Sequence, residues 1–364
     1  MPWVAKDRKA DPGPCRSFIK NMRINEPAVI SAIVAGREAA SDLYFLLPAR
    51  FTLPELLEAA RKLHTNLLVV LPSSFCIPKQ LPVGVSVLDP VSVGFSQKDT
   101  RVFLCTAAFV REDVFADILA RFRIGEVFVP FAELADPYAY GYQRGYRELG
   151  ELRAAITWPF HLTAFLSVAP ENESLLTGFY GSGKYAIAGV GETGPYPAVR
   201  LKNESEAKSF ICRFLNKYHT GTGVVLCPTR MLARQLYEYA AMRSDAVLVH
   251  GGQTPEENAE AVSRFCSGQA GVMIATKHVL GSYLLVQADR VCFLGLPYDE
   301  GHYLRMRHLL SDPKALPLIV RFDSDEDLLA GISAALARQA QIDETKFVGE
   351  RMRRLRSFFQ KLEE

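Results

Sequence analysis

The sequence predicts an α/β fold in which mainly parallel sheets are flanked by helices. Short apolar runs alternate with amphipathic helical stretches along most of the chain, which is the pattern of parallel strands covered by helices. Apolar residues make up 49% of the 364 residues and charged residues 23%, so a folded chain is expected rather than a disordered one. This length suits two domains, each with its own buried core.

Short apolar runs bounded by turn residues are predicted to be the buried strands. These runs are Asn66–Leu71, Arg101–Cys105, Glu126–Val129, Gly223–Cys227, Ala246–His250, Gly271–Thr276, Arg290–Leu294 and Leu316–Phe322. Helices between them are predicted to begin with a capping box at Thr52 and at Thr254, because a Glu stands three residues after each Thr. The segment from Leu328 to Glu364 is predicted to be helical throughout.

The segment from Gly178 to Pro197 is rich in glycine and proline and interrupts this alternation, so it is predicted to connect the two domains. We therefore expect an N-terminal arm at residues 1–20, a first domain at 21–185, a second domain at 186–330 and a helical tail at 331–364.

The overall charge and the cysteines limit the classes of function. The net charge is only +2, so a nucleic-acid-binding surface would have to come from local clustering of basic residues. No apolar run is long enough to span a membrane, and residues 1–14 lack the apolar core of a signal peptide. The seven cysteines form no Cys-x-x-Cys pair, which favours buried free thiols in a reducing intracellular compartment over a disulfide framework or a zinc site.

Two neighbouring segments, Arg123–Glu133 and Tyr146–Arg153, resemble without a gap the part of a RecQ-type (superfamily 2) DNA helicase that carries the Asp-Glu-Ala-His box. In the second half, Gly223–Arg230, Val249–Glu257 and Gly271–Pro297 follow the order and spacing of the same family. The resemblance covers residues from about 23 to about 328 and implies two tandem RecA-like domains, which the C-terminal helical tail would follow.

The departures from this family fall on the residues that bind and hydrolyse ATP. Pro130 and Phe131 stand where the family has the Asp that holds magnesium and the Glu that activates water. The family's phosphate loop is missing around Ser41 and Asp42. Asp42 is expected to stand at or beside the phosphate position and to repel a phosphate, because the two charges are alike.

The second domain also departs from the family at residues that act on ATP. Leu309 and Asp312 fall near the positions of the arginines that stabilise the transferred phosphoryl group in the family. Together these departures imply a pseudo-helicase, which hydrolyses no ATP and uses neither a nucleotide nor a metal ion as a cofactor. The competing interpretation is a relocated phosphate site at Gly178–Lys184, which satisfies Gly-x-x-x-x-Gly-Lys. Tyr185 follows this lysine instead of Ser or Thr, so a flexible hinge is the preferred interpretation.

Some residues are candidates for contact with nucleic acid. Tyr138, Tyr140 and Tyr142, with Tyr146 beyond them, lie where the family keeps an aromatic-rich loop, and such rings either stack on bases or pack half-buried. The candidates for phosphate contact are Thr106, Thr229, Arg230, His250 and Thr276. Strand-end Thr and Arg side chains can also cap the turns on which they stand, and His250 can equally be a core histidine.

The tail carries an apolar stripe with four-three spacing, formed by Val348, Met352, Leu355, Phe359 and Leu362. Such a stripe either packs against its own domain or docks on a protein partner.

The function that these patterns predict is a catalytically inactive, helicase-like subunit of a DNA replication, repair or recombination assembly, which binds nucleic acid or acts as a scaffold. Protein partners are expected, DNA is a candidate ligand, and a cytoplasmic, nucleoid or nuclear location is expected. A divergent nucleic-acid-dependent ATPase and a scaffold for proteins alone remain the alternatives.

Overall fold

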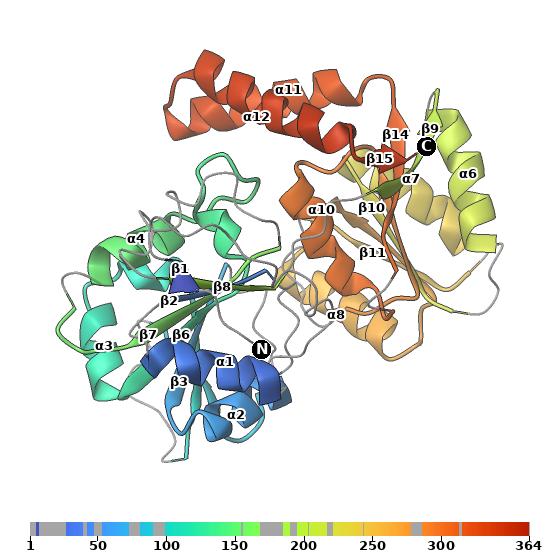
Figure 1. The fold of residues 1–364 in the computed structure, drawn as a ribbon. Coiled ribbons are helices and arrows are strands. Elements are labelled where there is room, and N and C mark those ends of the chain that lie inside the picture. Colours follow the sequence, from blue (N-terminus) through green and yellow to red (C-terminus); the bar gives the residue numbers. More distant parts are fainter. Residues whose placement is uncertain are drawn as a thin grey trace. The chain divides into compact units, whose positions relative to one another are not determined.

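The computed structural model of the chain divides into two compact units, Met1–Glu192 and Thr193–Glu364. Figure 1 shows that each unit has its own sheet with helices around it. The structure describes residues 5–6, 27–38, 42–46, 53–72, 81–89, 99–153, 156–167, 185–189, 195–202, 204–216, 221–242, 244–277, 286–312 and 315–363.

The first unit is built on an eight-stranded sheet. Among the described strands, β1 pairs antiparallel with β8 at one edge, and the other neighbours pair in parallel. The strand order is β1 (Ala5–Lys6), β8 (Tyr185–Gly189), β2 (Asp42–Leu46), β7 (His161–Phe165), β6 (Ile124–Val129), β3 (Asn66–Leu71), β5 (Val102–Thr106) and β4 (Val85–Val87). The central strands are buried along most of their length because helices cover the sheet.

The helices of the first unit follow the strands in alternation. They are α1 (Pro27–Glu38), α2 (Leu53–Lys62), α3 (Phe115–Arg121) and α4 (Arg144–Arg153), with the short 3-10 helices η3 (Phe109–Arg111) and η4 (Ala132–Ala135). Aromatic rings fill the core between the central strands. Phe165 stacks on Phe45 with ring centroids 5.5 Å apart, and Phe128 meets Phe165 edge-on at 5.3 Å, the two arrangements that aromatic pairs prefer.

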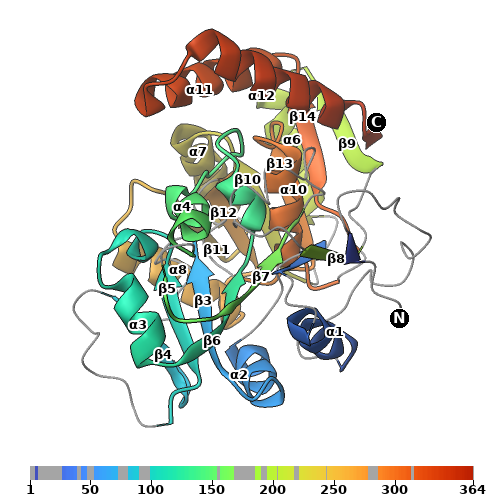
Figure 2. The same cartoon turned by 60° about the vertical axis from the view of Figure 1, so that its left-hand side comes forward.

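The second unit is built on a seven-stranded parallel sheet. The strand order is β11 (Ala246–Val249), β12 (Val272–Thr276), β10 (Gly223–Cys227), β13 (Arg290–Leu294), β14 (Leu318–Phe322), β9 (Tyr196–Leu201) and β15 (Leu362–Glu363). Its helices are α6 (Glu204–Asn216), α7 (Arg230–Ala241), α8 (Pro255–Cys266), α10 (Glu300–Met306), η5 (Arg307–Leu309), α11 (Asp325–Ala340) and α12 (Glu344–Phe359). Figure 2 separates this sheet from the α11–α12 pair above it.

The predicted strands are confirmed to within one or two residues at each end, and three are reproduced without change: Asn66–Leu71, Gly223–Cys227 and Arg290–Leu294. The capping box at Thr254 is also confirmed, because Thr254 Oγ1 accepts from Glu257 N–H and the Glu257 carboxylate accepts from Thr254 N–H. Thr52 lies outside the described residues. Cys105, Cys227 and Cys292 are buried thiols as expected, whereas Cys266 is exposed.

The division between the units falls at Glu192 and Thr193 rather than at residue 185. β8 lies inside the segment predicted to connect the domains, yet it pairs with β2 and completes the first sheet. The following strand, β9, already belongs to the second sheet. Glycine and proline content therefore indicated the region in which the two units divide. It did not show that this region contains β8, which belongs to the first unit.

The C-terminal helical tail is confirmed, but it is not helical throughout, because it consists of two helices followed by a short strand. α11 ends where Gln341 adopts a left-handed conformation with φ 55°, and α12 begins at an Asp343 cap whose side chain accepts from Lys346 N–H. Figures 1 and 2 show the two helices side by side. The chain then ends in β15, where Leu362 pairs with Tyr196 of β9.

The tail packs on its own unit. Phe358 is 1% exposed and lies against the rings of Tyr196 and Tyr303, with centroids 5.6 and 5.9 Å away. Of the residues predicted to bind a partner, Met352 and Leu355 are buried, whereas Val348, Phe359 and Leu362 are half-buried. The stripe therefore serves first to hold the tail to its own sheet, and Leu362 belongs to a strand rather than to the helix.

Candidate nucleic-acid interface and nucleotide position

The carboxyl end of β6 is filled with hydrocarbon. β6 ends at Val129, and the two residues that follow, Pro130 and Phe131, are both buried, with Phe131 2% exposed. In open parallel sheets, ligands bind beyond the carboxyl ends of the strands, so a metal ligand and a base would stand here. A pyrrolidine and a phenyl ring neither coordinate a metal ion nor accept a proton.

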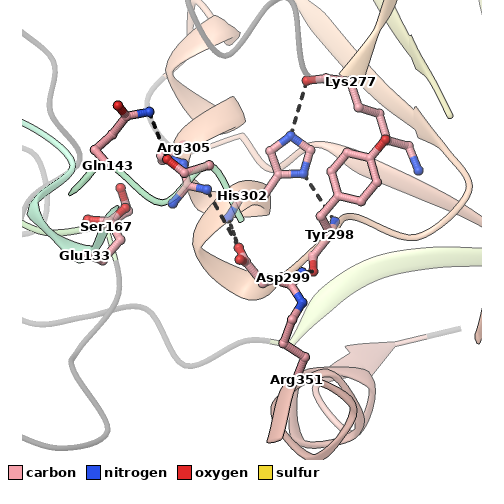
Figure 3. Close-up of polar contacts among 10 residues, drawn as sticks. Glu133, Gln143, Ser167, Lys277, Tyr298, Asp299, His302, Arg305 and Arg351 are labelled. Atoms are coloured by element: carbon pink, nitrogen blue, oxygen red, sulfur yellow. Dashed lines mark hydrogen bonds and ion pairs between the residues drawn. The ribbon is translucent and has the colours of Figure 1, made fainter. Parts of the chain in front are cut away.

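Phe131 also sets the direction of the chain after β6. Its φ of 55° lies in the left-handed region, which residues with a side chain rarely adopt. The turn leads into η4, where Glu133 is buried and its Oε2 accepts a hydrogen bond from Ser167 N–H at 3.2 Å. Figure 3 shows these two side chains next to each other. Glu133 therefore ties the chain after β6 to the chain after β7.

The position of the phosphate loop differs from the prediction. A phosphate loop joins a strand to the N-terminus of a helix, and this unit has that arrangement between β2 and α2. Asp42 begins β2 and lies at its amino end, so it stands at the opposite edge of the sheet from the one predicted; Ser41 lies outside the described residues. The segment between β2 and α2 reads Leu-Pro-Ala-Arg-Phe-Thr at 47–52, which contains neither glycine nor lysine.

The predicted arginine positions of the second unit hold no guanidinium. Leu309 is fully buried at the end of η5, and its carbonyl accepts a hydrogen bond from Ala288 N–H at 2.7 Å. Asp312, three residues on, is exposed. Two arginines that the sequence analysis did not single out, Arg305 and Arg307, are buried nearby, and Arg307 Nε donates to Ala315 O at 3.1 Å.

In the first unit, the start of α4, which follows the tyrosine loop, packs against the chain just beyond β5. Thr106 is the last residue of β5, and its hydroxyl lies 3.4 Å from Phe109 N–H, which donates to it. Gly145 of α4 approaches the backbone just beyond β5 so closely that a Cβ would come 1.7 Å from Ala107 O. Thr106 therefore at least caps its own turn, the alternative to phosphate contact.

The tyrosines of this loop do not share one environment. Tyr138, Tyr140 and Tyr142 are half-buried, so part of each ring is accessible. Tyr146 is fully buried, and its hydroxyl donates to Val70 O at 2.8 Å. Tyr146 is thus a core residue, and the aromatic surface of the loop comes from the other three.

In the second unit, Thr229 and Arg230 stand where β10 gives way to α7, and both are exposed. Thr229 caps α7, because its Oγ1 accepts from Leu232 N–H at 3.2 Å. Arg230 and Arg234 lie one turn apart on the exposed face of α7. Together with the first-turn N–H groups, these guanidinium groups make the start of α7 a surface of positive potential.

His250, which ends the run after β11, is a structural residue. It is 1% exposed, Gly252 N–H donates to its Nδ1 at 3.0 Å, and Arg234 Nε lies 3.1 Å from its Nε2. Burial and the charge of Arg234 lower the pKa of His250. The Asn258 side chain binds both backbone groups of His250, at 3.1 Å each. These contacts favour the core alternative and place the neutral ring under Arg234.

Thr276 ends β12 beside Cys227 of β10 and is fully buried. Its Oγ1 makes no hydrogen bond among the described residues. Contact between this hydroxyl and a nucleic-acid phosphate would therefore require neighbouring chain to move.

Lys277, the next residue, is a buried cation that the sequence analysis missed (Figure 3). Its Nζ donates to Leu296 O at 2.6 Å and lies 5.5 Å from the centre of the Tyr298 ring. Burial lowers the pKa of Lys277 to about 8, although the charge of Asp325 opposes this shift. A lysine directly after a fully apolar strand was the available signal.

Asp325 joins the carboxyl ends of β13 and β14 to the start of α11. Its Oδ2 accepts from Leu296 N–H at 3.0 Å and from Phe322 N–H at 2.8 Å. Gly295, with φ 78°, lies between the charges, since a Cβ there would come 3.0 Å from Asp325 Oδ1 and 3.1 Å from Lys277 Nζ. Asp325 is the first residue of α11 and has a structural role.

Hydrogen bonds through His302 and Tyr298 anchor α10 next to Lys277 and to α12. His302 Nδ1 accepts from Tyr298 N–H and its Nε2 donates to Lys277 O, both at 3.3 Å, so one neutral tautomer satisfies both contacts. Burial lowers the pKa of His302 to about 3. On the other side of Tyr298, Arg351 Nη2 of α12 donates to Tyr298 O at 3.1 Å. Tyr298 therefore links α12 to the carboxyl edge of the second sheet (Figure 3), in addition to the packing of Phe358 and the pairing of β15 with β9.

The segment Gly178–Lys184 lies outside the described residues. The residues that follow it directly form β8, whereas a phosphate loop must be followed by a helix N-terminus. Within the part of the chain that the structure describes, no three His, Cys, Asp or Glu side chains are grouped as a metal site would need. None of the described helices has both the length and the apolar character of a membrane span.

No protein-family model matches the sequence, and no curated protein matches it. Solved structures do match. The helicase Lhr of Mycobacterium smegmatis, bound to ssDNA and AMP-PNP, aligns with a TM-score of 0.61 at 13% identity, over 86% of this chain and 47% of Lhr. The DUF1998 helicase MrfA, bound to DNA and AMPPNP, aligns with a TM-score of 0.56 at 10% identity, over 82% of this chain and 49% of MrfA.

A Dbp5 variant from S. cerevisiae, bound to a Gle1 variant and IP6, aligns with a TM-score of 0.52 at 12% identity, over 91% of this chain and 92% of Dbp5. The chain spans about half the length of Lhr and MrfA. At these identities the likeness establishes the fold: two tandem RecA-like units of the kind found in superfamily 2 helicase cores, with a C-terminal helical pair.

Proposed function

We propose that this protein is a catalytically inactive, RecQ-like member of the superfamily 2 helicase fold that binds nucleic acid or acts as a scaffold in a DNA replication, repair or recombination assembly. The observation that carries the proposal is the carboxyl end of β6, where Pro130 and Phe131 are packed in the core. A magnesium ligand and a general base cannot be supplied from these positions.

Two further observations support the absence of ATP hydrolysis. The segment between β2 and α2 has no glycine to cradle phosphates and no lysine to reach them. In the second unit, Leu309 is buried where a guanidinium would stabilise the transferred phosphoryl group, and losing one such arginine costs about 10³-fold or more in rate. Each loss alone would slow ATP hydrolysis. Together they leave no residue at these positions to bind the phosphates, activate water or stabilise the transferred phosphoryl group.

Retained nucleic-acid binding is supported by the exposed start of α7. Arg230 and Arg234 are both exposed there beside the Thr229 cap, and contacts of this type bind phosphates without reading sequence. The half-buried Tyr138, Tyr140 and Tyr142 of the first unit would supply rings for stacking. Lhr and MrfA in their DNA complexes, and the RecQ-type resemblance of the sequence, make DNA the first ligand to test.

ATP hydrolysis by the purified chain is the decisive measurement. We expect no turnover with ATP and magnesium, either alone or with saturating single-stranded DNA, duplex DNA or RNA. The matched control is Lys184→Ala, which removes the lysine of the Gly178–Lys184 segment. Stimulated turnover in the unaltered chain that disappears in this variant would establish the competing divergent ATPase.

Binding of labelled single-stranded DNA at low salt separates the nucleic-acid-binding role from a scaffold for proteins alone. We expect binding that weakens in Arg230→Gln and not in Arg264→Gln, a control at an exposed position in the last turn of α8. Absence of binding even at low salt would leave only the protein scaffold. Affinity capture from the native source would then identify the partners, which are expected to be intracellular proteins.

A further inference from the structure

A cavity of about 560 Å³ opens at the amino end of the first sheet. β6 and β7 begin beside it, with Gly125 and His161 in its lining. This is the edge opposite the carboxyl ends discussed above, so the cavity is separate from the positions of a helicase's nucleotide. Its volume lies in the range of small-molecule sites. The residues that matter for recognition are Arg37, Thr65, Arg153, Trp158, Phe160 and His161.

The lining of the cavity is basic, since the residues described there include arginine and histidine but no Asp or Glu. Contacts with Glu126 and Leu63 hold the Arg37 side chain in place. Its Nε and Nη2 lie 2.8 and 2.7 Å from Oε2 of Glu126, which is fully buried, and its Nη1 donates to Leu63 O at 3.2 Å. Glu126 also accepts from Thr163 Oγ1 at 2.6 Å. Arg153 adds a second guanidinium to the described lining of the cavity.

Aromatic rings stand beside these charges in fixed orientations. The guanidinium carbon of Arg153 lies 5.3 Å from the centre of the Phe160 ring, and Arg153 Nη2 donates to Phe160 O at 3.3 Å. Trp158 Nε1 donates to Ile124 O at 2.6 Å, which fixes the indole at the start of β6. A cation and a planar apolar surface are therefore combined in one cavity.

His161 responds to the charge of whatever occupies the cavity. Burial and the charges of Arg37 and Arg153 lower the pKa of His161, so its ring is neutral near pH 7. The other ionisable groups near it are His64 in the lining and Glu126 beneath Arg37. A bound anion would offset the two cations and raise the pKa of His161.

We propose that this cavity binds a small phosphorylated molecule with a planar ring, of the class of nucleoside 5′-monophosphates. Arg153 would pair with the phosphate, since guanidinium groups bind phosphate oxygens through two hydrogen bonds. Trp158 would lie against the ring, since bases stack on aromatic side chains. The same chemistry is presented by a free nucleotide and by the 5′-phosphorylated end of a nucleic-acid strand.

Trp158 fluorescence tests this binding directly. The chain has two tryptophans, so Trp3→Phe leaves Trp158 as the only one. We expect a saturable change in fluorescence on titration with AMP, and weaker binding of inorganic phosphate because phosphate lacks the ring. Single-stranded DNA with a 5′-phosphate and the same DNA with a 5′-hydroxyl distinguish the sources. A response to AMP supports a free nucleotide as ligand, and a response to the phosphorylated strand alone supports a strand end.

Variants assign the binding to this cavity. Arg153→Gln should weaken AMP binding at least tenfold, Arg153→Lys should weaken it less because lysine keeps the charge but not the pair of hydrogen bonds, and Arg264→Gln in the last turn of α8 should leave it unchanged. Circular dichroism melts of each variant check the fold. Arg37 is left intact, because removing it would leave Glu126 buried without its partner.

The second readout is the pKa of His161, followed by NMR, which should rise when AMP binds. Absence of a saturable signal with AMP and with the phosphorylated strand would overturn the proposal, as would equal binding by Arg153→Gln. These outcomes are independent of whether the chain hydrolyses ATP.

Discussion

Phe131 meets two demands that usually conflict. Its ring is 2% exposed and its φ is 55°, so the backbone is in a region that favours glycine while the core requires a large side chain. Truncation of a buried Phe to Ala typically costs about 3–5 kcal/mol. The left-handed conformation costs residues with a Cβ roughly 1–2 kcal/mol relative to glycine.

These two terms give a testable order of stability. Phe131→Ala should lower the free energy of unfolding by about 3–5 kcal/mol, and Phe131→Gly should lower it by less, against the usual cost of glycine. Urea denaturation followed by circular dichroism measures both. A glycine variant clearly less stable than the alanine variant would show that the turn after β6 is not strained.

Lys277 makes stability depend on pH in a direction unusual for lysine. Burial lowers its pKa in the folded chain to about 8, whereas an unfolded lysine has a pKa of about 10.4. Between these values the unfolded chain binds the extra proton, so stability rises as pH increases from about 8 to about 10.4. Below pH 8, Lys277 is protonated in both the folded and the unfolded chain. The cost of burying its charge then lowers stability in full.

The comparison that isolates this effect is between the unaltered chain and Lys277→Met. The difference in unfolding free energy between them should change by up to about 3 kcal/mol across this pH range, at 1.36 kcal/mol per pKa unit. Groups that do not interact with Lys277 contribute equally to both chains, whereas Cys227, Cys292 and Asp325 interact with it. Parallel pH profiles for the two chains would mean that Lys277 has an ordinary pKa.

At the scale of elements, α12 is held by a buried arginine as well as by its apolar stripe. Arg351 is 3% exposed, and it donates to Ser333 Oγ of α11 and to Tyr298 O, both at 3.1 Å. Its guanidinium also lies 5.8 Å from the centre of the Phe347 ring. One side chain therefore joins both tail helices to the loop before α10.

Arg351→Met should loosen the tail without unfolding the sheet. It leaves the buried Tyr298 carbonyl without this donor, at a cost of about 1–3 kcal/mol. Hydrogen exchange should accelerate in α11 and α12 more than in β10 or β13. The exposed Arg356→Met is the matched control on the same helix and should leave exchange unchanged. Equal effects of the two variants would contradict the anchoring role.

Element types were easier to predict than their ends or their breaks. The runs that became β3, β10 and β13 were identified correctly because a fully apolar stretch of that length fits a strand covered on both faces. The break at Gln341 was missed because no glycine or proline marks it, although Asp343 is a residue type that commonly caps the start of a helix. Asp42 was expected at or beside the phosphate position, whereas it begins β2 and so lies at the amino end of that strand.

At the scale of the whole molecule, a net charge of +2 limits how strongly the chain can bind nucleic acid through long-range attraction. Binding would depend on few phosphate contacts, so the fall of log affinity with log salt concentration should be shallow. Each phosphate contact adds about 0.7 to this slope for single strands. Arg230→Gln should therefore reduce the slope by about 0.7, measured by fluorescence anisotropy over a salt series. An unchanged slope would place the contacts elsewhere.

The sequence by itself determined the α/β class, the positions of most strands and the absence of carboxylates at Pro130 and Phe131, the two positions directly after β6. These follow from local composition, because burial on both faces of a strand leaves a continuous apolar run. Only the tertiary structure decided which strands are neighbours, and hence which side chains share an edge. Thr276 and Leu309 are buried, Lys277 faces Leu296, and Arg351 reaches Tyr298 because strands distant in sequence pair in parallel. Such contacts depend on strand order, which no local pattern encodes.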